Sequence, residues 1–227
     1  MELKQKYSIK SIEYFECKEW CLKKHYARRM PPIEYAFGIF DLNGIIQGIV
    51  TFGTPVSSTL RNLWKNEFKL MELNRLVINE GLEKNILSYF VSNTLKKMPK
   101  PLVIVSYADT SKNHNGYIYQ ATNWIYTGLS KEFKDIAVKG LENAHHSTIE
   151  DLVRGKVNRI EALREIFGDR LYYIERSRKH RYFIFTGSKR EKKIMLQMLP
   201  YKILEYPKGE NKKYEASFKP STQIKLF

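Results

Sequence analysis

The sequence predicts an α/β fold, of the α+β kind, in which helices flank a mixed central sheet. Three observations lead to this prediction. The β-branched run at residues 102–105 follows Pro101 and is typical of a buried strand. Asn43-Gly44 separates two apolar runs, which indicates a hairpin. Apolar residues recur at helical spacing over residues 86–98, as expected of a helix that packs on a sheet.

Length and composition fit one folded core with an extension. Of the 227 residues, 43% are hydrophobic, which is enough to form a core. No apolar run is long enough for a transmembrane helix, and the lysine-rich start lacks the apolar centre of a signal peptide. We therefore expect a cytoplasmic protein, in the host cell if a phage encodes it. Its predicted parts are a catalytic core at 1–140 and a basic extension at 141–227.

The charge balance favours a polyanionic partner. The chain has 39 basic and 24 acidic residues, a net charge of +15. Nucleic acid is the first partner to consider for such a protein. Fifteen tyrosines add rings that can stack on unpaired bases. The alternative is a generally basic protein from an A·T-rich genome, where lysine and tyrosine are common. Double-stranded DNA is the expected partner, and a homodimer is left open.

The first part of the chain is predicted to run strand, helix, strand, strand. The predicted elements are a strand or ordered arm at 1–10, a helix at 11–24, and hairpin strands at 35–40 and 45–52. Pro31 and Pro32 follow the helix and cannot continue it. Cys17 and Cys21 lie four residues apart on this helix and lack partners for a cysteine-based zinc site.

The remaining elements follow from local patterns. Residues 53–68 are predicted to be an irregular connection, and 131–140 a loop. Predicted strands lie at 69–78, 171–174 and 182–185, and predicted helices at 86–98, near 148, at 157–167 and at 193–199. Asn85 can cap the helix that follows it. Residues 208–227 form a polar tail.

Polar side chains gather after the strand at 102–105. Ser106 and Asp109 end it, a polar turn with His114 follows, and Tyr119 lies on a predicted short helix. In open α/β sheets, ligands bind beyond the carboxyl ends of strands. We therefore expect a site here. The alternative is a strand, loop and helix in which Asp109 caps the turn and Tyr119 packs in the core.

The same stretch resembles the phage Mom-type DNA-modification proteins, which have an acetyltransferase-like (GNAT) fold. The resemblance rests on SYAD at 106–109, GYIYQATNW at 116–124 and YTG at 126–128. Three other pieces fit it: HY with RRMP at 25–31, ELNRL at 72–76 and KHRY at 179–182. Together these pieces span residues 23–207. The resemblance thus implies a GNAT-like sheet as the predicted fold.

The resemblance also implies a function. It implies transfer of a carbamoylmethyl-type group to adenine N6 in double-stranded DNA, which shields phage DNA from host restriction. An ordinary N-acyltransferase that uses an acyl-coenzyme A is the first alternative, and a non-catalytic DNA-binding protein is the second. The Arg/Gln-x-x-Gly-x-Gly loop of acetyltransferases is missing, since Gly81 stands almost alone. The small donor is therefore left open between an acyl-coenzyme A-like compound and another molecule.

Candidate site residues fall into four groups. The catalytic candidates are Asp109, Tyr119, Tyr26 and Ser106. The donor-binding candidates are Arg75, Asn85, Ser88 and Asn123. A metal, iron or another divalent ion, is expected mainly from the resemblance, with His25 and Asp109 as ligands. A histidine at a helix end is alternatively a capping group. The nucleic-acid candidates are Arg28, Arg29, Arg176, Arg178, Lys179, Arg181, Lys189 and Arg190.

Overall fold

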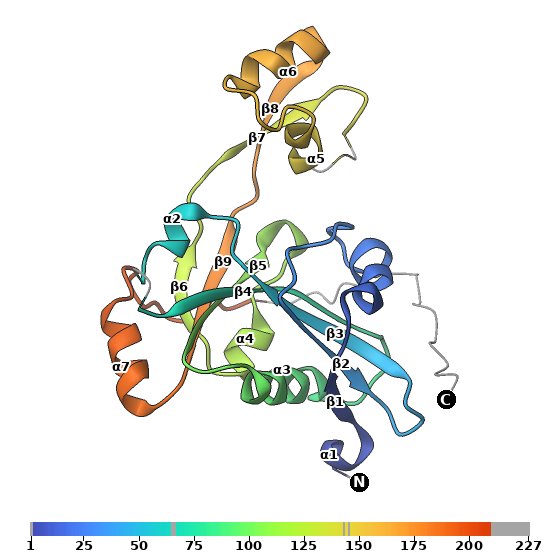
Figure 1. Ribbon diagram of the computed structural model, residues 1–227, viewed down its shortest axis with the longest axis vertical. Coiled ribbons are helices and arrows are strands. Elements are labelled where there is room, and N and C mark those ends of the chain that lie inside the picture. Colours follow the sequence, from blue (N-terminus) through green and yellow to red (C-terminus); the bar gives the residue numbers. More distant parts are fainter. Residues whose placement is uncertain (1, 65–66, 143, 145, 210–227) are drawn as a thin grey trace. The chain divides into compact units, whose positions relative to one another are not determined.

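The computed structural model describes residues 2–64, 67–142, 144 and 146–209, and these divide into two compact units. Unit 1 holds the described residues up to Leu129 and from His180 onward, and unit 2 is Ser130–Lys179. Unit 2 is therefore an insertion between two strands of unit 1 (Figure 1). This division differs from the predicted boundary at residue 140, because the chain leaves the main sheet at 130 and returns to it at 180.

Unit 1 is built on a sheet of seven strands within the described residues. Their order is β1 (Ser8–Ser11), β2 (Tyr35–Phe40), β3 (Ile46–Gly53), β4 (Lys69–Ile78), β5 (Leu102–Asp109), β9 (Lys179–Thr186) and β6 (Ile125–Leu129). The first four strands pair antiparallel in turn, β4 and β5 pair parallel, and β6 pairs antiparallel with β9. The predicted mixed sheet is confirmed.

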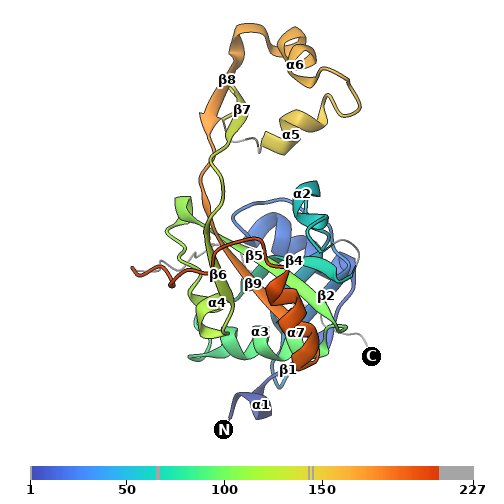
Figure 2. The same cartoon turned by 90° about the vertical axis from the view of Figure 1, so that its left-hand side faces the viewer.

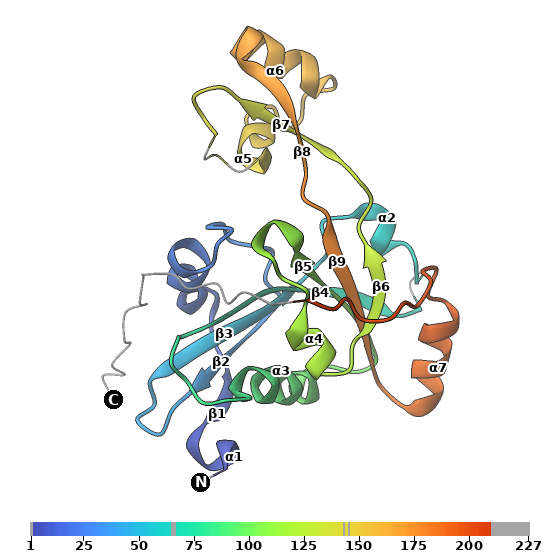
Figure 3. The ribbon, with the colours of Figure 1, turned by 180° about the vertical axis from the view of Figure 1, so that it is seen from behind.

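Helices cover both faces of this sheet. They are α1 (Leu3–Lys6), α2 (Ser58–Arg61), α3 (Ile86–Lys97), α4 (Tyr117–Ala121) and α7 (Lys189–Gln197). One face packs against α3 and α4 (Figure 3), and the other packs against α2 and α7 (Figure 2). The side chains of β5 alternate between them, since Ile104 joins the α3 core and Val103 joins the α7 core. Among the described helices, none has the length and apolar character that crossing a membrane requires.

Three apolar clusters fill unit 1, and each contains one tryptophan. Trp124 lies in the α3 cluster, Trp64 in the α7 cluster, and Trp20 in a third cluster with Cys17 and Cys21. Both thiols are buried, and burial is the main cause that raises the pKa of Cys17 to about 12 and that of Cys21 to about 11. The two cysteines are therefore neutral core residues.

Unit 2 has a small core of its own. It consists of β7 (Lys134–Val138), α5 (His146–Asp151), α6 (Arg159–Phe167) and β8 (Leu171–Glu175). The two strands pair antiparallel, with Ile136 opposite Tyr173. Apolar side chains of both helices pack on β7, among them Ile149 and Leu163. Arg176 donates to the buried carboxylate of Asp135 over 2.7 Å.

Two predicted elements were wrong, and two predicted strands are confirmed. Residues 11–24 form a 3-10 helix, Tyr14–Cys17, and then a π-helix, Trp20–Lys24, in place of one regular helix. Residues 131–140 contain β7 where a loop was predicted. The predicted strands at 171–174 and 182–185 exist, but they belong to different sheets, because β8 pairs with β7 and β9 pairs with β6.

Candidate functional site

β4 and β5 run side by side only over their first halves. Their parallel pairing ends at Glu72 and Val105, although β4 continues to Ile78 and β5 to Asp109. Beyond this point the two strands share no further ladder within the described residues. Polar groups can therefore enter the sheet between the far halves of β4 and β5, and we call this place the β4–β5 opening.

Ser106 and Tyr119 close the inner end of the β4–β5 opening. The Ser106 hydroxyl oxygen lies 2.7 Å from the Leu73 carbonyl oxygen and 2.7 Å from the Tyr119 hydroxyl oxygen. A serine has one proton to donate, so it donates to the carbonyl and accepts from Tyr119. Burial raises the pKa of Tyr119 above its usual value, which keeps this phenol neutral. Its ring packs against Trp124 and Tyr182, as the core alternative predicted.

The segment at residues 24–32 is fixed to β4 and to the residues that follow it. The Lys24 ammonium, which is only 1% exposed, donates to both carboxylate oxygens of Glu80 over 2.8 and 2.7 Å. Further along, Arg75 donates to the Arg29 carbonyl over 3.0 Å, and Asn74 donates to the Pro32 carbonyl over 2.7 Å. These contacts set the position of His25 and Tyr26, which lie between them.

Tyr26 lies at the centre of a polar cluster with His25, Asp109, Lys112 and His114. The His25 and Tyr26 rings stack with their centroids 4.2 Å apart, and the His114 ring meets Tyr26 edge-on at 6.0 Å. The Lys112 ammonium lies 5.9 Å from the centre of the Tyr26 ring. Burial, and then the negative charge of Asp109, raises the pKa of Tyr26 to about 12. Burial lowers the pKa of His114, so its imidazole stays neutral at pH 7.

Asp109 caps the turn and also faces the polar cluster. Its Oδ1 accepts from the Ser111 amide over 3.0 Å and from the Ser111 hydroxyl over 2.8 Å. The predicted alternative, a capping aspartate, is therefore seen. The carboxylate also acts electrostatically on Tyr26 and His114. The two bonds from Ser111 fix the direction of the carboxylate.

Arg75 is a partly buried cation whose guanidinium donates to the backbone carbonyls of Asn74 and Arg29. No carboxylate of a described residue lies within ion-pair distance of its guanidinium, and its Nε–H is buried without a hydrogen-bond partner among them. Burial lowers the pKa of Arg75, and Cys21, Tyr26 and Glu72 oppose this shift. A buried charge of this kind is costly unless something compensates it. An oxygen-bearing anion from outside the chain would satisfy it.

The other donor-binding candidates lie at two turns. Asn85 precedes α3 with a left-handed φ of 66°, and its side chain makes no capping bond, contrary to the prediction. The Ser88 hydroxyl donates to the Asn85 carbonyl over 2.9 Å. Asn123 is exposed in the turn between α4 and β6, with φ 60°.

The residues predicted to bind a metal do not fit one. No group of three or more histidine, cysteine, aspartate or glutamate side chains with metal-binding geometry occurs in the described part of the chain. The Nδ1 of His25 accepts from the Ala27 amide over 3.0 Å, and Ser111 occupies Oδ1 of Asp109. Tyr26 holds its proton because its pKa is raised to about 12. Sites for iron need several free donors at once, so the iron prediction is not supported.

The basic residues predicted to contact DNA separate into three places. Arg176, Arg178 and Lys179 belong to unit 2, where Arg176 binds Asp135 and Arg178 donates to the Ser130 carbonyl over 2.8 Å. Arg181 donates to Thr127 over 2.9 Å and stacks 3.5 Å from the centre of the Tyr201 ring. Arg176, Arg178 and Arg181 thus have partners within the protein, and their contact with DNA stays a prediction.

Lys189 and Arg190 lie at the other end of the sheet from the polar cluster. Both are exposed at the start of α7, directly after β9. The end of β9 meets the start of β5, because the Leu102 amide donates to the Thr186 hydroxyl over 3.1 Å. Asp109 ends the same strand, so the length of β5, about 23 Å at ~3.3 Å per residue, separates the two places. Arg28 and Arg29, in contrast, lie two and three residues after Tyr26.

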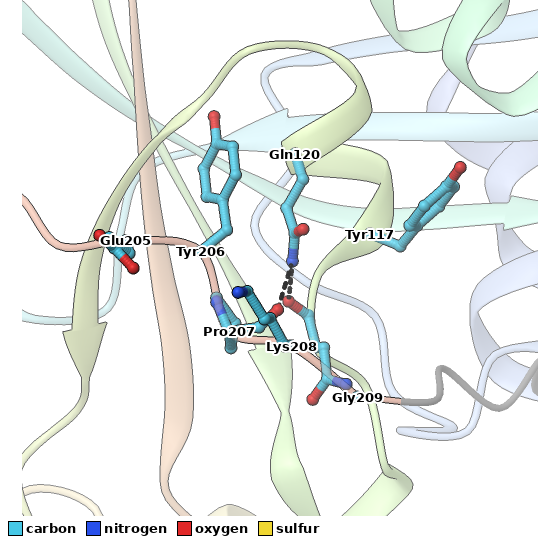
Figure 4. Close-up of a pocket in the computed structure, with 8 residues that line it drawn as sticks. Tyr117, Gln120, Glu205, Tyr206, Pro207, Lys208 and Gly209 are labelled. Carbon is cyan, nitrogen blue, oxygen red and sulfur yellow. Dashed lines mark hydrogen bonds between the residues drawn. The ribbon is translucent and has the colours of Figure 1, made fainter.

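A hollow of about 510 Å³ lies beside α4 (Figure 4). Its lining residues are Asn115, Tyr117, Gln120, Glu205, Tyr206, Pro207, Lys208 and Gly209. Gln120 donates to the Asn115 and Pro207 carbonyls over 3.0 and 3.3 Å, which ties residues 205–209 to α4. This hollow was not predicted from the sequence, because residues 205–209, which line one side of it after α7, have no local sequence pattern.

Comparisons with known proteins place the chain in a family. Residues 6–208 match the model of the Mom protein family. The methylcarbamoylase mom of Escherichia phage Mu is 26% identical over 200 residues, which cover 82% of this chain and 77% of that protein.

Solved structures with a similar arrangement include two acetyltransferases. A GNAT-family acetyltransferase from Bacillus cereus ATCC 10987 is 14% identical, with 67% of this chain and 71% of that chain covered and a TM-score of 0.36. The spermidine/spermine N-acetyltransferase SpeG from Vibrio cholerae, in complex with manganese ions, is 9% identical, with 86% and 99% covered and a TM-score of 0.44. Similarity this distant carries over neither a substrate nor a cofactor. The match over residues 6–208 covers most of the sequence, and the chain therefore belongs to the Mom protein family.

Proposed function

We propose that this protein is a transferase that adds a carbamoylmethyl-type group to adenine N6 in double-stranded DNA and so protects phage DNA from host restriction. Membership of the Mom family supports this proposal, as does the name of the phage Mu relative, a methylcarbamoylase. The net charge of +15 suits a DNA substrate. The observation that carries the proposal is the convergence of Tyr26, Asp109 and Arg75 near the β4–β5 opening.

The donor would enter the β4–β5 opening and meet Arg75. The buried Nε–H of this residue lacks a partner among the described residues, so a carbonyl or carboxylate oxygen of the donor would supply one. An acyl-coenzyme A-like compound and other small donors both carry such an oxygen. Arg75 would then hold the donor's polar end, while Ser106 and Tyr119 form the inner end of the opening.

Asp109 is the proposed proton acceptor. The amino group at adenine N6 is a poor nucleophile, because its lone pair is delocalised into the ring. As the new bond from N6 to the donor carbon forms, the donor's leaving group departs with the electron pair of its own bond, and N6 gives up a proton. A carboxylate whose direction is fixed by Ser111 can accept that proton. General-base help of this kind contributes roughly a hundred- to ten-thousand-fold in rate.

Tyr26 is the proposed hydrogen-bond donor to the reacting groups. Its phenol stays protonated, because burial and Asp109 raise its pKa to about 12. A fixed donor stabilises charge that develops on the leaving group or on a carbonyl oxygen. Adenine in a duplex must be extruded from the stack before its amino group can reach these side chains.

Nucleoside analysis tests the proposed function. The protein is expressed in a bacterium, and the DNA is digested to nucleosides and analysed by mass spectrometry. We expect a new nucleoside heavier than deoxyadenosine because of one added carbamoylmethyl group, and at least tenfold less of it from cells expressing Asp109→Asn. Unmodified deoxyadenosine alone, from cells that contain soluble folded protein under several growth conditions, would show the proposal to be wrong.

A further inference from the structure

Two exposed cations, Arg28 and Lys112, lie near Tyr26, the first in the sequence and the second in space. Arg28 follows it in a turn that the Arg28 amide closes by donating to the His25 carbonyl over 3.0 Å. Lys112 ends the 3-10 helix that Asp109 caps, and its ammonium lies over the Tyr26 ring at 5.9 Å. Neither the Arg28 guanidinium nor the Lys112 ammonium makes a hydrogen bond or an ion pair with a described residue.

The backbone holds both cations at these positions. Arg28 adopts a left-handed φ of 43°, a conformation that costs a residue other than glycine of order 1 kcal/mol or more. Lys112 is fixed because the Asp109 side chain accepts from Ser111 within the same turn. A strained or capped backbone under an unpaired charge indicates that the position of that charge matters.

The charges nearby explain why cations are needed at this place. Asp109 and Glu72 both act electrostatically on Tyr26, and each raises its pKa. Two carboxylates near the reacting group would repel the phosphates of an approaching polyanion. Lys112 offsets part of this repulsion, since its charge is close enough to lower the pKa of His114.

We infer that Arg28 and Lys112 form a phosphate clamp, each binding one backbone phosphate beside the nucleotide that is presented to Tyr26 and Asp109. This inference rests on the proposed function. A nucleotide within a strand has one phosphate on each side, and the two cations lie in separate turns, one after Tyr26 and one after Asp109. Arginine can bind a phosphate through two N–H groups and lysine as a point charge. Contacts of this kind position the strand without reading its sequence.

Phosphates next to the reacting nucleotide would then contact Arg28 and Lys112, and not the basic residues at the start of α7. Lys189, Arg190, Lys192 and Lys193 are also exposed, but they begin about 23 Å away at the other end of β5. They provide controls of equal charge on a regular helix.

The salt dependence of DNA binding tests the clamp. The full chain is titrated with a fluorescein-labelled duplex at several salt concentrations, for the wild type, Arg28→Gln, Lys112→Gln and the double variant. Each phosphate contact adds about 0.9 to the slope of log affinity against log salt. We expect each single variant to lose about 0.9 of the slope and the double variant about 1.8. The matched control, Lys192→Gln with Lys193→Gln, removes the same charge and should keep the wild-type slope.

A double clamp variant that keeps its melting temperature and the wild-type slope would overturn the inference. So would a control pair that loses as much slope as the double variant does. Nucleoside analysis of the same wild-type protein separates the two proposals. If the slopes change as expected and no new nucleoside forms, the clamp stands and the proposed chemistry fails. If the nucleoside forms and the slopes do not change, the chemistry stands and the clamp fails.

Discussion

Asp109 combines two roles that the sequence presented as alternatives. It caps the turn through Ser111, and its carboxylate acts on Tyr26 and His114. Both capping bonds go to one carboxylate oxygen, Oδ1. Asp109 thus stabilises the turn, and the turn in return fixes the position of Asp109 beside the polar cluster.

Asp109→Asn should separate these two roles. An asparagine oxygen can still accept from Ser111, so we expect the melting temperature to fall by only a few degrees. The amide cannot take a proton, so the rate of DNA modification should fall at least tenfold, and up to ten-thousand-fold if all general-base help is lost. The rate is measured as new nucleoside formed per unit time. A near-normal rate in the folded variant would exclude Asp109 as the base.

Gly116→Ala should disturb the site through packing. Gly116 has φ 74°, and an added Cβ would meet the Tyr182 ring. Left-handed strain and overpacking should together destabilise the protein by about 2–4 kcal/mol and displace α4 with Tyr119. Gly81→Ala is the control, because its φ of 76° is similar and nothing lies within 4 Å of the added Cβ. Denaturant unfolding measures the free energy of unfolding of both variants. Equal losses would show that backbone strain, without overpacking against Tyr182, accounts for the effect.

Glu83 should make stability depend on acid pH. Hydrogen bonds from Tyr7 and then from Lys6 lower the pKa of Glu83 from 4.5 to about 2. A carboxyl group whose pKa is lower in the folded state stabilises it above the unfolded pKa, and this contribution is lost as the pH falls through the folded pKa. Wild type should therefore melt above Glu83→Gln at pH 7, and the difference should disappear between about pH 4.5 and 2. A difference that does not change with pH would contradict this assignment.

At the scale of elements, the π-helix Trp20–Lys24 is the unusual one. It delivers His25 and Tyr26 directly from its last residue, and π-helical turns are often found at functional sites. Its Lys24 is buried and paired with Glu80, which lies just after β4. This pair connects the segment that carries Tyr26 to the strand that carries Arg75.

Lys24→Met should lower activity more than stability. Methionine fills the buried space, and the Glu80 carboxylate that remains is partly exposed and can be hydrated. We expect a loss of less than about 1.5 kcal/mol in unfolding free energy but at least a tenfold loss of modification, because Tyr26 is no longer anchored. Glu80→Ala should destabilise more, by up to about 3 kcal/mol, since it leaves the buried ammonium without this carboxylate. Unchanged activity in Lys24→Met would show that the pair does not position Tyr26.

Elements with strong local patterns were predicted from the sequence, and those that depend on distant partners were not. The predicted bounds of β4, residues 69–78, are those observed, and the Asn43-Gly44 hairpin is confirmed. β7 was missed because it has only three apolar residues, which follow Lys134 and Asp135, and only pairing with β8 defines it. The cluster of Asp109 and His114 lies on one continuous stretch, whereas Lys24, Glu80 and Arg75 meet only through the fold.

At the scale of the whole molecule, positive charge is concentrated in unit 1. Unit 2 has eleven basic and nine acidic residues, a net charge of +2. The whole chain carries +15, which leaves +13 for the rest of the sequence. General attraction to DNA should therefore come mainly from unit 1.

Removal of unit 2 tests this distribution. Leu129 and His180 are opposite each other in the β6–β9 pairing, so a two-residue Asn-Gly turn can join them directly. We expect the shortened protein to fold and to bind duplex DNA with nearly the wild-type salt slope. Circular dichroism and the labelled-duplex titration measure the two properties. A folded protein that has lost most of the slope would place the DNA contacts in unit 2.

The three tryptophans give the molecule an internal set of optical reporters. Each is almost fully buried, and each belongs to a different apolar cluster of unit 1, whereas unit 2 contains none. Trp124 lies 5.0 Å from the Tyr119 ring at the inner end of the β4–β5 opening, and Trp20 begins the π-helix that leads to Tyr26. Variants that keep a single tryptophan would therefore emit separately from each layer of the protein. Their fluorescence could follow a donor at one face of the sheet and a rearrangement of the Tyr26 segment independently, without any attached dye.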